Sequence, residues 1–155
     1  MLGWRGVRSC GTHTLAAVPC MFASRGEQAF ESRGRGHGNL LGLLQSAGLA
    51  VFWLDNQAGC KGVCVRVPNA SAFDGLDAAT KKALCDGDEC LDDVMLKNLD
   101  ERIAALPAER RARGIVLVMH QMGSHGPAYY KRSAPDVKRF QPECIFLWVQ
   151  TAGFP

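Results

Sequence analysis

Two threonines stand between two cysteines near the start of the chain, in the string CGTHTLAAVPC at residues 10–20. A threonine hydroxyl is a poor nucleophile at neutral pH, so chemistry at Thr12 or Thr14 requires a metal or a base and a rigid frame. A disulfide between Cys10 and Cys20 would supply that frame, because closing so short a loop removes about 2–3 kcal/mol of unfolded-state entropy. The pattern also fits a simpler role, in which Thr14 caps a helix over residues 15–22.

A lysine and two histidines are the other candidates for chemistry. Lys61 lies between Cys60 and Cys64 in a tight loop, where it either meets a phosphate or is an ordinary surface lysine. His120 and His125 follow an apolar run on a glycine-punctuated loop, whereas a structural histidine more often lies inside a helix or strand. Three separate stretches of the chain therefore carry candidate site residues.

Alternating helices and strands are expected to position these stretches. Apolar periodicity predicts helices over residues 15–22, 39–48, 76–84 and 91–106, and short apolar runs predict buried parallel strands over residues 49–54 and 115–119. The acidic turn at residues 85–90 lacks the ligand spacing of an EF-hand and is predicted to be a solvated loop. The pattern favours an α/β fold, in which sites lie at the carboxyl ends of the strands.

The cysteine content indicates an oxidising compartment. Seven cysteines form three local pairs and leave Cys144 over: Cys10 with Cys20, Cys60 with Cys64, and Cys85 with Cys90. Such pairs are typical of extracytoplasmic disulfide frameworks. The competing interpretation is a cytosolic zinc site, but there is no C-x-x-C pair, and His37 has no partner at ligand spacing.

Length and charge further limit the kinds of protein that this chain can be. With 155 residues, 47% of them hydrophobic, the chain can build one domain with a moderate core. A net charge of +3 is too weak to indicate nucleic-acid binding. Residues 1–7 are too few and too polar for a signal peptide, and no stretch approaches the ~18 apolar residues of a transmembrane helix.

Three ordered motifs carry a resemblance to a known family. They are VRSCGTHT at residues 7–14 with VPCMF at 18–22, FWLDNQ at 52–57 with GCKGVC at 59–64, and HQMGSHGPAYYKR at 120–132. Together they resemble the bacterial phosphoethanolamine transferases that modify lipid A, the group that includes the mobile colistin-resistance enzymes. The resemblance runs from about residue 7 to residue 144.

The resemblance implies a part of an alkaline-phosphatase and sulfatase-like α/β domain, with a mostly parallel sheet, flanking helices and disulfide-stapled loops. It places the parent enzyme at the periplasmic face of the bacterial inner membrane, with phosphatidylethanolamine as donor and lipid A as acceptor. Thr14 matches the family nucleophile, whose oxygen binds Zn²⁺. Thr12, Lys61 and His125 match residues on the substrate and phosphate side.

The sequence also departs from the family pattern. The family's glutamate zinc ligand upstream and its Asp-His pair downstream have no counterpart here, so Thr14 is the one metal ligand that the resemblance assigns to this chain. His13 replaces a small residue, Ala58 replaces a polar one, and Cys144 lacks the downstream cysteine with which it pairs in the family. We therefore expect a catalytic-domain fragment that is inactive alone.

The domain organisation follows from the same comparison. Residues 1–144 are expected to form the central part of a sulfatase-like catalytic domain, and residues 145–155 a divergent tail that arises from a frameshift or a truncated reading frame. Two other functions remain open at this point. One is a sulfatase-type or phosphodiesterase hydrolase, and the other is a disulfide-stapled module without catalysis.

Overall fold

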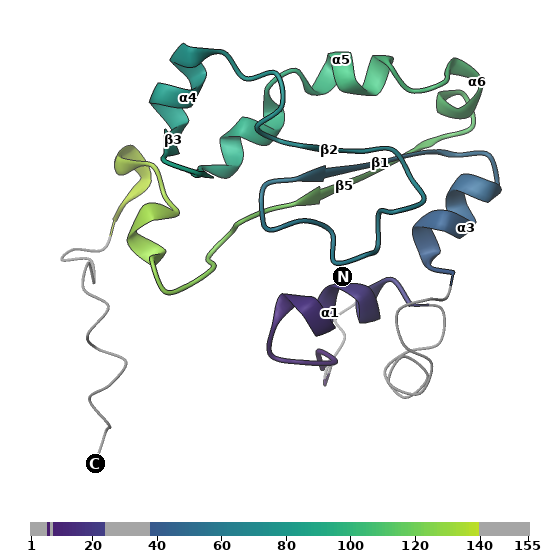
Figure 1. Cartoon of the computed structure of the whole chain (residues 1–155), viewed down its shortest axis with the longest axis horizontal. Helices are drawn as coiled ribbons and strands as arrows, with labels where there is room; N and C mark the ends of the chain where they lie inside the picture. The colour runs from purple at the N-terminus through teal and green to yellow at the C-terminus, as the bar shows by residue number, and fades with distance from the viewer. Residues whose placement is uncertain (1–5, 7, 24–37, 140–155) are drawn as a thin grey trace.

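A computed structural model of the chain describes residue 6, residues 8–23 and residues 38–139. At its centre lies a three-stranded parallel sheet with strand order β2-β1-β5, formed by β1 (Ala50–Asp55), β2 (Asn69–Ser71) and β5 (Ile115–His120). Figure 1 shows α1 (Thr14–Met21) and α3 (Leu40–Ser46) on one side of this sheet and α4 (Ala78–Leu84), α5 (Leu99–Ala104) and α6 (Ala108–Arg111) on the other. The predicted α/β class is confirmed.

The central strand β1 is buried on both faces because its side chains alternate between two apolar clusters. On one face Phe52 and Leu54 pack with Val94 and Met95, which lie in the 3-10 helix η1 (Asp92–Leu96). On the other face Trp53 packs with residues of α1, α3 and the loop after β1. Burial of both faces fixes the strand, and with it the position of the polar residues at its carboxyl end.

Most of the predicted elements are confirmed. The strands predicted over residues 49–54 and 115–119 are β1 and β5, which pair in parallel from Ala50 opposite Ile115 to Asp55 opposite His120. The predicted burial is confirmed for β1 and wrong for β5, which is only partly buried because it pairs on one side alone among the described residues. Asn39 caps α3, since its side-chain oxygen accepts a hydrogen bond from the Gly42 N–H at 3.0 Å. The helices predicted over residues 15–22 and 76–84 correspond to α1 and α4.

The single helix predicted over residues 91–106 is wrong. Lys97 is extended and Asn98 adopts a left-handed conformation with φ 53°, so the segment divides into η1 and α5. The break has a tertiary cause, because the Asn98 side chain donates to the Gly75 carbonyl at 3.3 Å and asparagine tolerates this backbone conformation. The apolar periodicity still identified the buried face, since Val94 and Met95 are fully buried and Leu106 is nearly so.

Two β-structures, one in the central sheet and one outside it, were not predicted. β2 has the sequence Asn-Ala-Ser, which lacks the apolar character of the other strands, and it is held by pairing with β1. The acidic turn at residues 85–90 forms a small antiparallel hairpin of β3 (Cys85–Asp86) and β4 (Glu89–Cys90). Gly87 turns this hairpin with a positive φ of 63°, which glycine adopts without strain.

All three predicted disulfides are present: Cys10–Cys20, Cys60–Cys64 and Cys85–Cys90. The prediction for Cys144, and that for residues 145–155, concern residues outside the described ranges. Within those ranges, no helix has the length and apolar character needed to cross a membrane.

Candidate functional site

A cleft of about 270 Å³ opens beyond the carboxyl ends of β1 and β5. Parallel α/β sheets place their sites at this edge, because the loops that leave neighbouring strands converge there. Its walls come from α1, from the loops after β1 and β5, and from the hairpin: Thr14, Gln57, Ala58, Lys61, Glu89, Met122, His125, Gly126, Pro127, Ala128 and Arg132. Thr14, Lys61 and His125 therefore share one cleft, whereas Thr12 is exposed and is not part of its lining.

Thr14 is the first residue of α1 and does not cap it. The N-cap is His13, whose carbonyl accepts from the Ala16 and Ala17 N–H groups at 3.1 and 3.0 Å. Within the described residues the Thr14 hydroxyl has no hydrogen-bond partner, so the interpretation of Thr14 as a cap is wrong. The first turn of a helix carries unpaired N–H groups and a partial positive charge, which favour an anion beside this hydroxyl.

Lys61 reaches the cleft from a strained loop. Its backbone has a positive φ of 54°, a conformation that is uncommon for residues other than glycine. The Cys60–Cys64 disulfide closes the loop around it. The Lys61 ammonium donates a hydrogen bond to the carbonyl of Ala58, another residue of the cleft wall. A positive charge is thus held at the edge of the cleft.

His125 presents one ring nitrogen to its surroundings. Its Nδ1 lies 2.8 Å from the Gly126 carbonyl oxygen. A carbonyl can only accept, so Nδ1 carries the proton of the neutral ring. In the part of the chain that the structure describes, Nε2 is then left without a hydrogen bond, and the side chain is exposed. Nε2 is therefore the nitrogen available for a ligand.

The Asp55 carboxylate links the segments beneath the cleft by hydrogen bonds. Its Oδ1 accepts from His120 Nδ1 at 2.7 Å and from Trp53 Nε1 at 3.3 Å, and its Oδ2 accepts from the backbone N–H groups of Gln57 and Gly59. This one carboxylate joins the ends of β1 and β5 to the loop that leads to Lys61. His120, a candidate for chemistry from its sequence position, belongs to this framework and does not line the cleft.

Asp55 makes the fold sensitive to acid. Burial alone would raise its pKa, but the hydrogen bonds from His120, Gly59 and Trp53 outweigh burial and hold the pKa below 3.8. Because the folded-state pKa lies below the unfolded value, the charged form stabilises the fold above about pH 4. That contribution is lost as the pH falls through the folded-state pKa.

We expect Asp55→Asn to lower the free energy of unfolding at pH 7 by about 1–3 kcal/mol, because the new amide cannot accept from both loop N–H groups and His120. The variant should also lose less stability than the parent below about pH 4. Urea denaturation between pH 7 and pH 2.5 measures both effects. Asp93→Asn, at an exposed position, is the control. Equal destabilisation of the two variants would contradict the assignment.

Asp92 fixes the loop that carries His125. Its Oδ1 accepts from the Met122 N–H and from Asn56 Nδ2, both at 2.8 Å, and its Oδ2 accepts from the Gly123 N–H at 2.8 Å. Asn56 is itself buried at the end of β1. The carboxylate thus joins the loops after both strands from a third segment. No local pattern in the sequence marks Asp92 for this role.

The described residues do not supply a zinc site on their own. Catalytic zinc takes about three protein ligands and keeps one open position. Across residues 8–23 and 38–139, no group of three or more His, Cys, Asp or Glu side chains is placed to hold a metal ion. These residues therefore do not fit a complete zinc centre on their own.

The Sulfatase family model matches residues 5–145 of the chain. The chain is 38% identical over 144 residues to phosphoethanolamine transferase EptA of Escherichia coli, covering 92% of this chain and 25% of that protein. It is 37% identical over 142 residues to the Escherichia coli phosphatidylethanolamine transferase Mcr-1, covering 89% and 25%. The chain spans about a quarter of the length of these curated relatives.

The fold of this chain also resembles that of a solved structure. The integral membrane protein lipooligosaccharide phosphoethanolamine transferase A (EptA) from Neisseria meningitidis matches with a TM-score of 0.76 and 38% sequence identity. The match covers 90% of this chain and 24% of that one. The fold of this chain is therefore found within a larger protein.

Proposed function

This chain belongs to the sulfatase family, and we propose that it is a segment of the catalytic domain of a bacterial phosphoethanolamine transferase. Residues 1–144 are proposed as the central part of that domain and residues 145–155 as a divergent tail. The relatives are named for transfer of phosphoethanolamine, and the chain corresponds to about a quarter of their length. The activity of the whole enzyme is thus proposed for a longer protein.

The observation that most supports this function is the common cleft of Thr14, Lys61 and His125. A hydroxyl at a helix N-terminus, an ammonium group and a free imidazole nitrogen suit a tetrahedral anion with a reactive phosphorus. Disulfides hold both the loop that precedes Thr14 and the loop of Lys61. We therefore assign Thr14 as nucleophile, and Lys61 and His125 as phosphate-binding groups, with Thr12 as a supporting hydroxyl.

The proposed reaction has two displacements at phosphorus. The Thr14 oxygen attacks the phosphorus of phosphatidylethanolamine and gives up its proton, the bond from phosphorus to the diacylglycerol oxygen breaks, and that oxygen takes up one proton as diacylglycerol leaves. A phosphate oxygen of lipid A then attacks the phosphoethanolamine-threonine, the bond from phosphorus to the threonine oxygen breaks, and the proton released by the accepting phosphate returns to Thr14. The charges of Lys61 and of the α1 N-terminus stabilise the extra negative charge on the phosphoryl oxygens in both steps.

The setting of the reaction is proposed in the same way. Membership of the sulfatase family is consistent with a metal cofactor, and we propose Zn²⁺, bound with Thr14 as one ligand in the whole transferase. Both proposed substrates are lipids, and we propose that the domain acts at the periplasmic face of the bacterial inner membrane. The disulfide-linked loops suit an oxidising periplasm.

A chimaera tests this function directly. The segment of Escherichia coli EptA that aligns with this chain is replaced by this chain, and the chimaera is expressed in a strain without its own phosphoethanolamine transferases. We expect mass spectrometry of lipid A to show added phosphoethanolamine, because the scaffold supplies the parts of the domain that lie beyond the aligned segment. Phosphatidylethanolamine should be converted to diacylglycerol in proportion to the transfer.

The chain on its own is the matched control. We expect the purified 155-residue chain with Zn²⁺ to transfer no phosphoethanolamine, because its described residues lack a three-ligand metal group. A chimaera that reaches parental levels in the membrane and releases free phosphoethanolamine without modifying lipid A would indicate a hydrolase. A chimaera with neither product would refute the transferase assignment.

A further inference from the structure

Arg132 connects the β3–β4 hairpin to the loop that carries His125. Its two terminal nitrogens donate to the Glu89 carboxylate at 3.1 and 3.3 Å, and its Nε donates to the His125 carbonyl at 3.0 Å. The Arg132 side chain is only 8% exposed. A guanidinium group is a planar fork, so bidentate pairing with Glu89 fixes the direction of the Nε–H as well.

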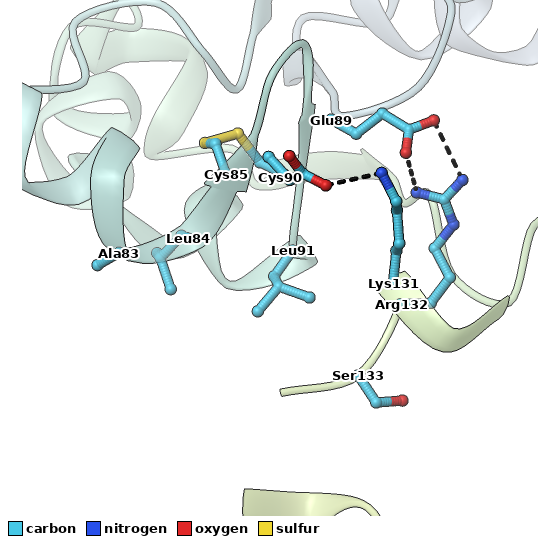
Figure 2. A pocket seen from close by; sticks show the side chains of 10 residues that line it. Ala83, Leu84, Cys85, Glu89, Cys90, Leu91, Lys131, Arg132 and Ser133 are labelled. Atoms are coloured by element: carbon cyan, nitrogen blue, oxygen red, sulfur yellow. Dashed lines mark hydrogen bonds and ion pairs between the residues drawn. A yellow bond between two sulfur atoms is a disulfide. The ribbon is translucent and has the colours of Figure 1, made fainter. Parts of the chain in front are cut away.

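The hairpin is a rigid support for this contact. The Cys85–Cys90 disulfide closes it next to Glu89, as Figure 2 shows, and Cys90 is 5% exposed within the apolar core. The buried Asn56 side chain donates to the Cys90 carbonyl at 3.1 Å. Glu89 is therefore attached to the end of β1, from which the site is built.

The neighbouring ion pair, between Lys131 and Asp86, is not joined to the loop that carries His125 in this way. Lys131 pairs with Asp86 at 2.7 Å, but their side chains are 34% and 77% exposed. Figure 2 shows the two pairs side by side, both between the hairpin and the same turn. Lys131 makes no hydrogen bond to His125 among the described residues. The two pairs differ in the burial of the cation, since Arg132 is 8% and Lys131 34% exposed, and in contact with the loop that carries His125.

We propose that Glu89 and Arg132 are positioning residues for His125. Arg132 donates a hydrogen bond to the His125 carbonyl, and the His125 ring forms a hydrogen bond with the carbonyl of the next residue, Gly126. Fixing this short piece of backbone fixes where Nε2 lies at the cleft wall. Both Glu89 and Arg132 also line the cleft, so the support lies directly beside the ring that it orients. The catalytic consequence rests on the proposed function.

Hydrogen exchange in the full 155-residue chain tests the positioning without any activity. Glu89→Gln removes the charged fork and should make the backbone amides of His125 and Tyr129 exchange about tenfold faster or more. Asp86→Asn removes the exposed pair on the same hairpin and should leave these amides within about twofold of the parent. Equal effects of the two variants, or no effect of Glu89→Gln, would overturn the proposal.

A charge exchange separates positioning from simple ion pairing. The double variant Glu89→Arg with Arg132→Glu restores opposite charges across the hairpin, but its carboxylate has no N–H for the His125 carbonyl. We expect the thermal unfolding midpoint of the double variant to lie closer to that of the parent than the midpoint of either single variant. The backbone amides of the loop that carries His125 should still exchange fast. Full recovery of slow exchange would show that Arg132 acts only as an ion-pair partner and would overturn the proposal.

The chimaera then measures the catalytic consequence. Glu89→Gln should lower kcat about tenfold with a smaller change in KM, since Lys61 and the α1 N-terminus still bind the phosphate and His125 stays in the cleft but is less well placed. Asp86→Asn should change neither. An active chimaera that tolerates Glu89→Gln would overturn the catalytic part of the proposal. If the unmodified chimaera is inactive, the proposed function fails, and the exchange comparison alone decides the positioning.

Discussion

Thr14→Ala is expected to reduce phosphoethanolamine transfer by the chimaera by at least about 10³-fold. The reason is that alanine removes the oxygen that attacks phosphorus, while α1 and its disulfide remain. Alanine is also a good helix former, so the first turn of α1 should be unchanged. Lipid A mass spectrometry, normalised to the amount of chimaera in the membrane, measures the loss.

Two neighbouring variants show whether the effect belongs to this hydroxyl. Thr14→Ser keeps an oxygen at the same position and should retain measurable transfer. Thr12→Ala should cost less than about tenfold, because Thr12 is exposed and lies outside the cleft lining. Mass spectrometry of the active chimaera, quenched during turnover, should find phosphoethanolamine on the peptide that contains Thr14. Transfer by a folded Thr14→Ala chimaera would disprove the assignment.

The candidate site was largely predictable because its residues lie in short local patterns. Cysteine spacing predicted all three disulfides, since each closes a loop of ten residues or fewer along the chain. The apolar runs predicted β1 and β5, and strands of this kind present their following loops at one edge. That edge is where the structure places Lys61 and His125 together.

The polar framework beneath the cleft was not predictable from the sequence. Asp92 and Glu89 act on residues about 30 and 43 positions away, and only the folded chain brings such pairs together. The same reason explains the break in the predicted helix over residues 91–106. The apolar periodicity predicted which side chains are buried. The hydrogen bond from Asn98 to the Gly75 carbonyl set the backbone conformation that interrupts the helix.

Trp53→Ala is expected to lower the free energy of unfolding by about 3–5 kcal/mol. Trp53 is 1% exposed, and its ring contacts Phe22 at 5.7 Å and His120 at 5.3 Å between centroids. Alanine would leave a cavity between the central strand and the residue that follows α1. It would also remove the indole N–H from Asp55. Urea denaturation followed by circular dichroism measures the loss.

Trp53→Phe separates the two contributions of this side chain. Phenylalanine keeps most of the packing against Phe22 and loses the hydrogen bond to Asp55, so it should cost about 1–2 kcal/mol. Because Trp53 contacts both the end of α1 and the Asp55–His120 pair, the alanine variant should disturb the cleft as well as the core. In the chimaera, we therefore expect transfer to fall further for Trp53→Ala than for Trp53→Phe. If the free energy of unfolding of Trp53→Ala lies within about 1 kcal/mol of the parent value, the packing around Trp53 does not support the site.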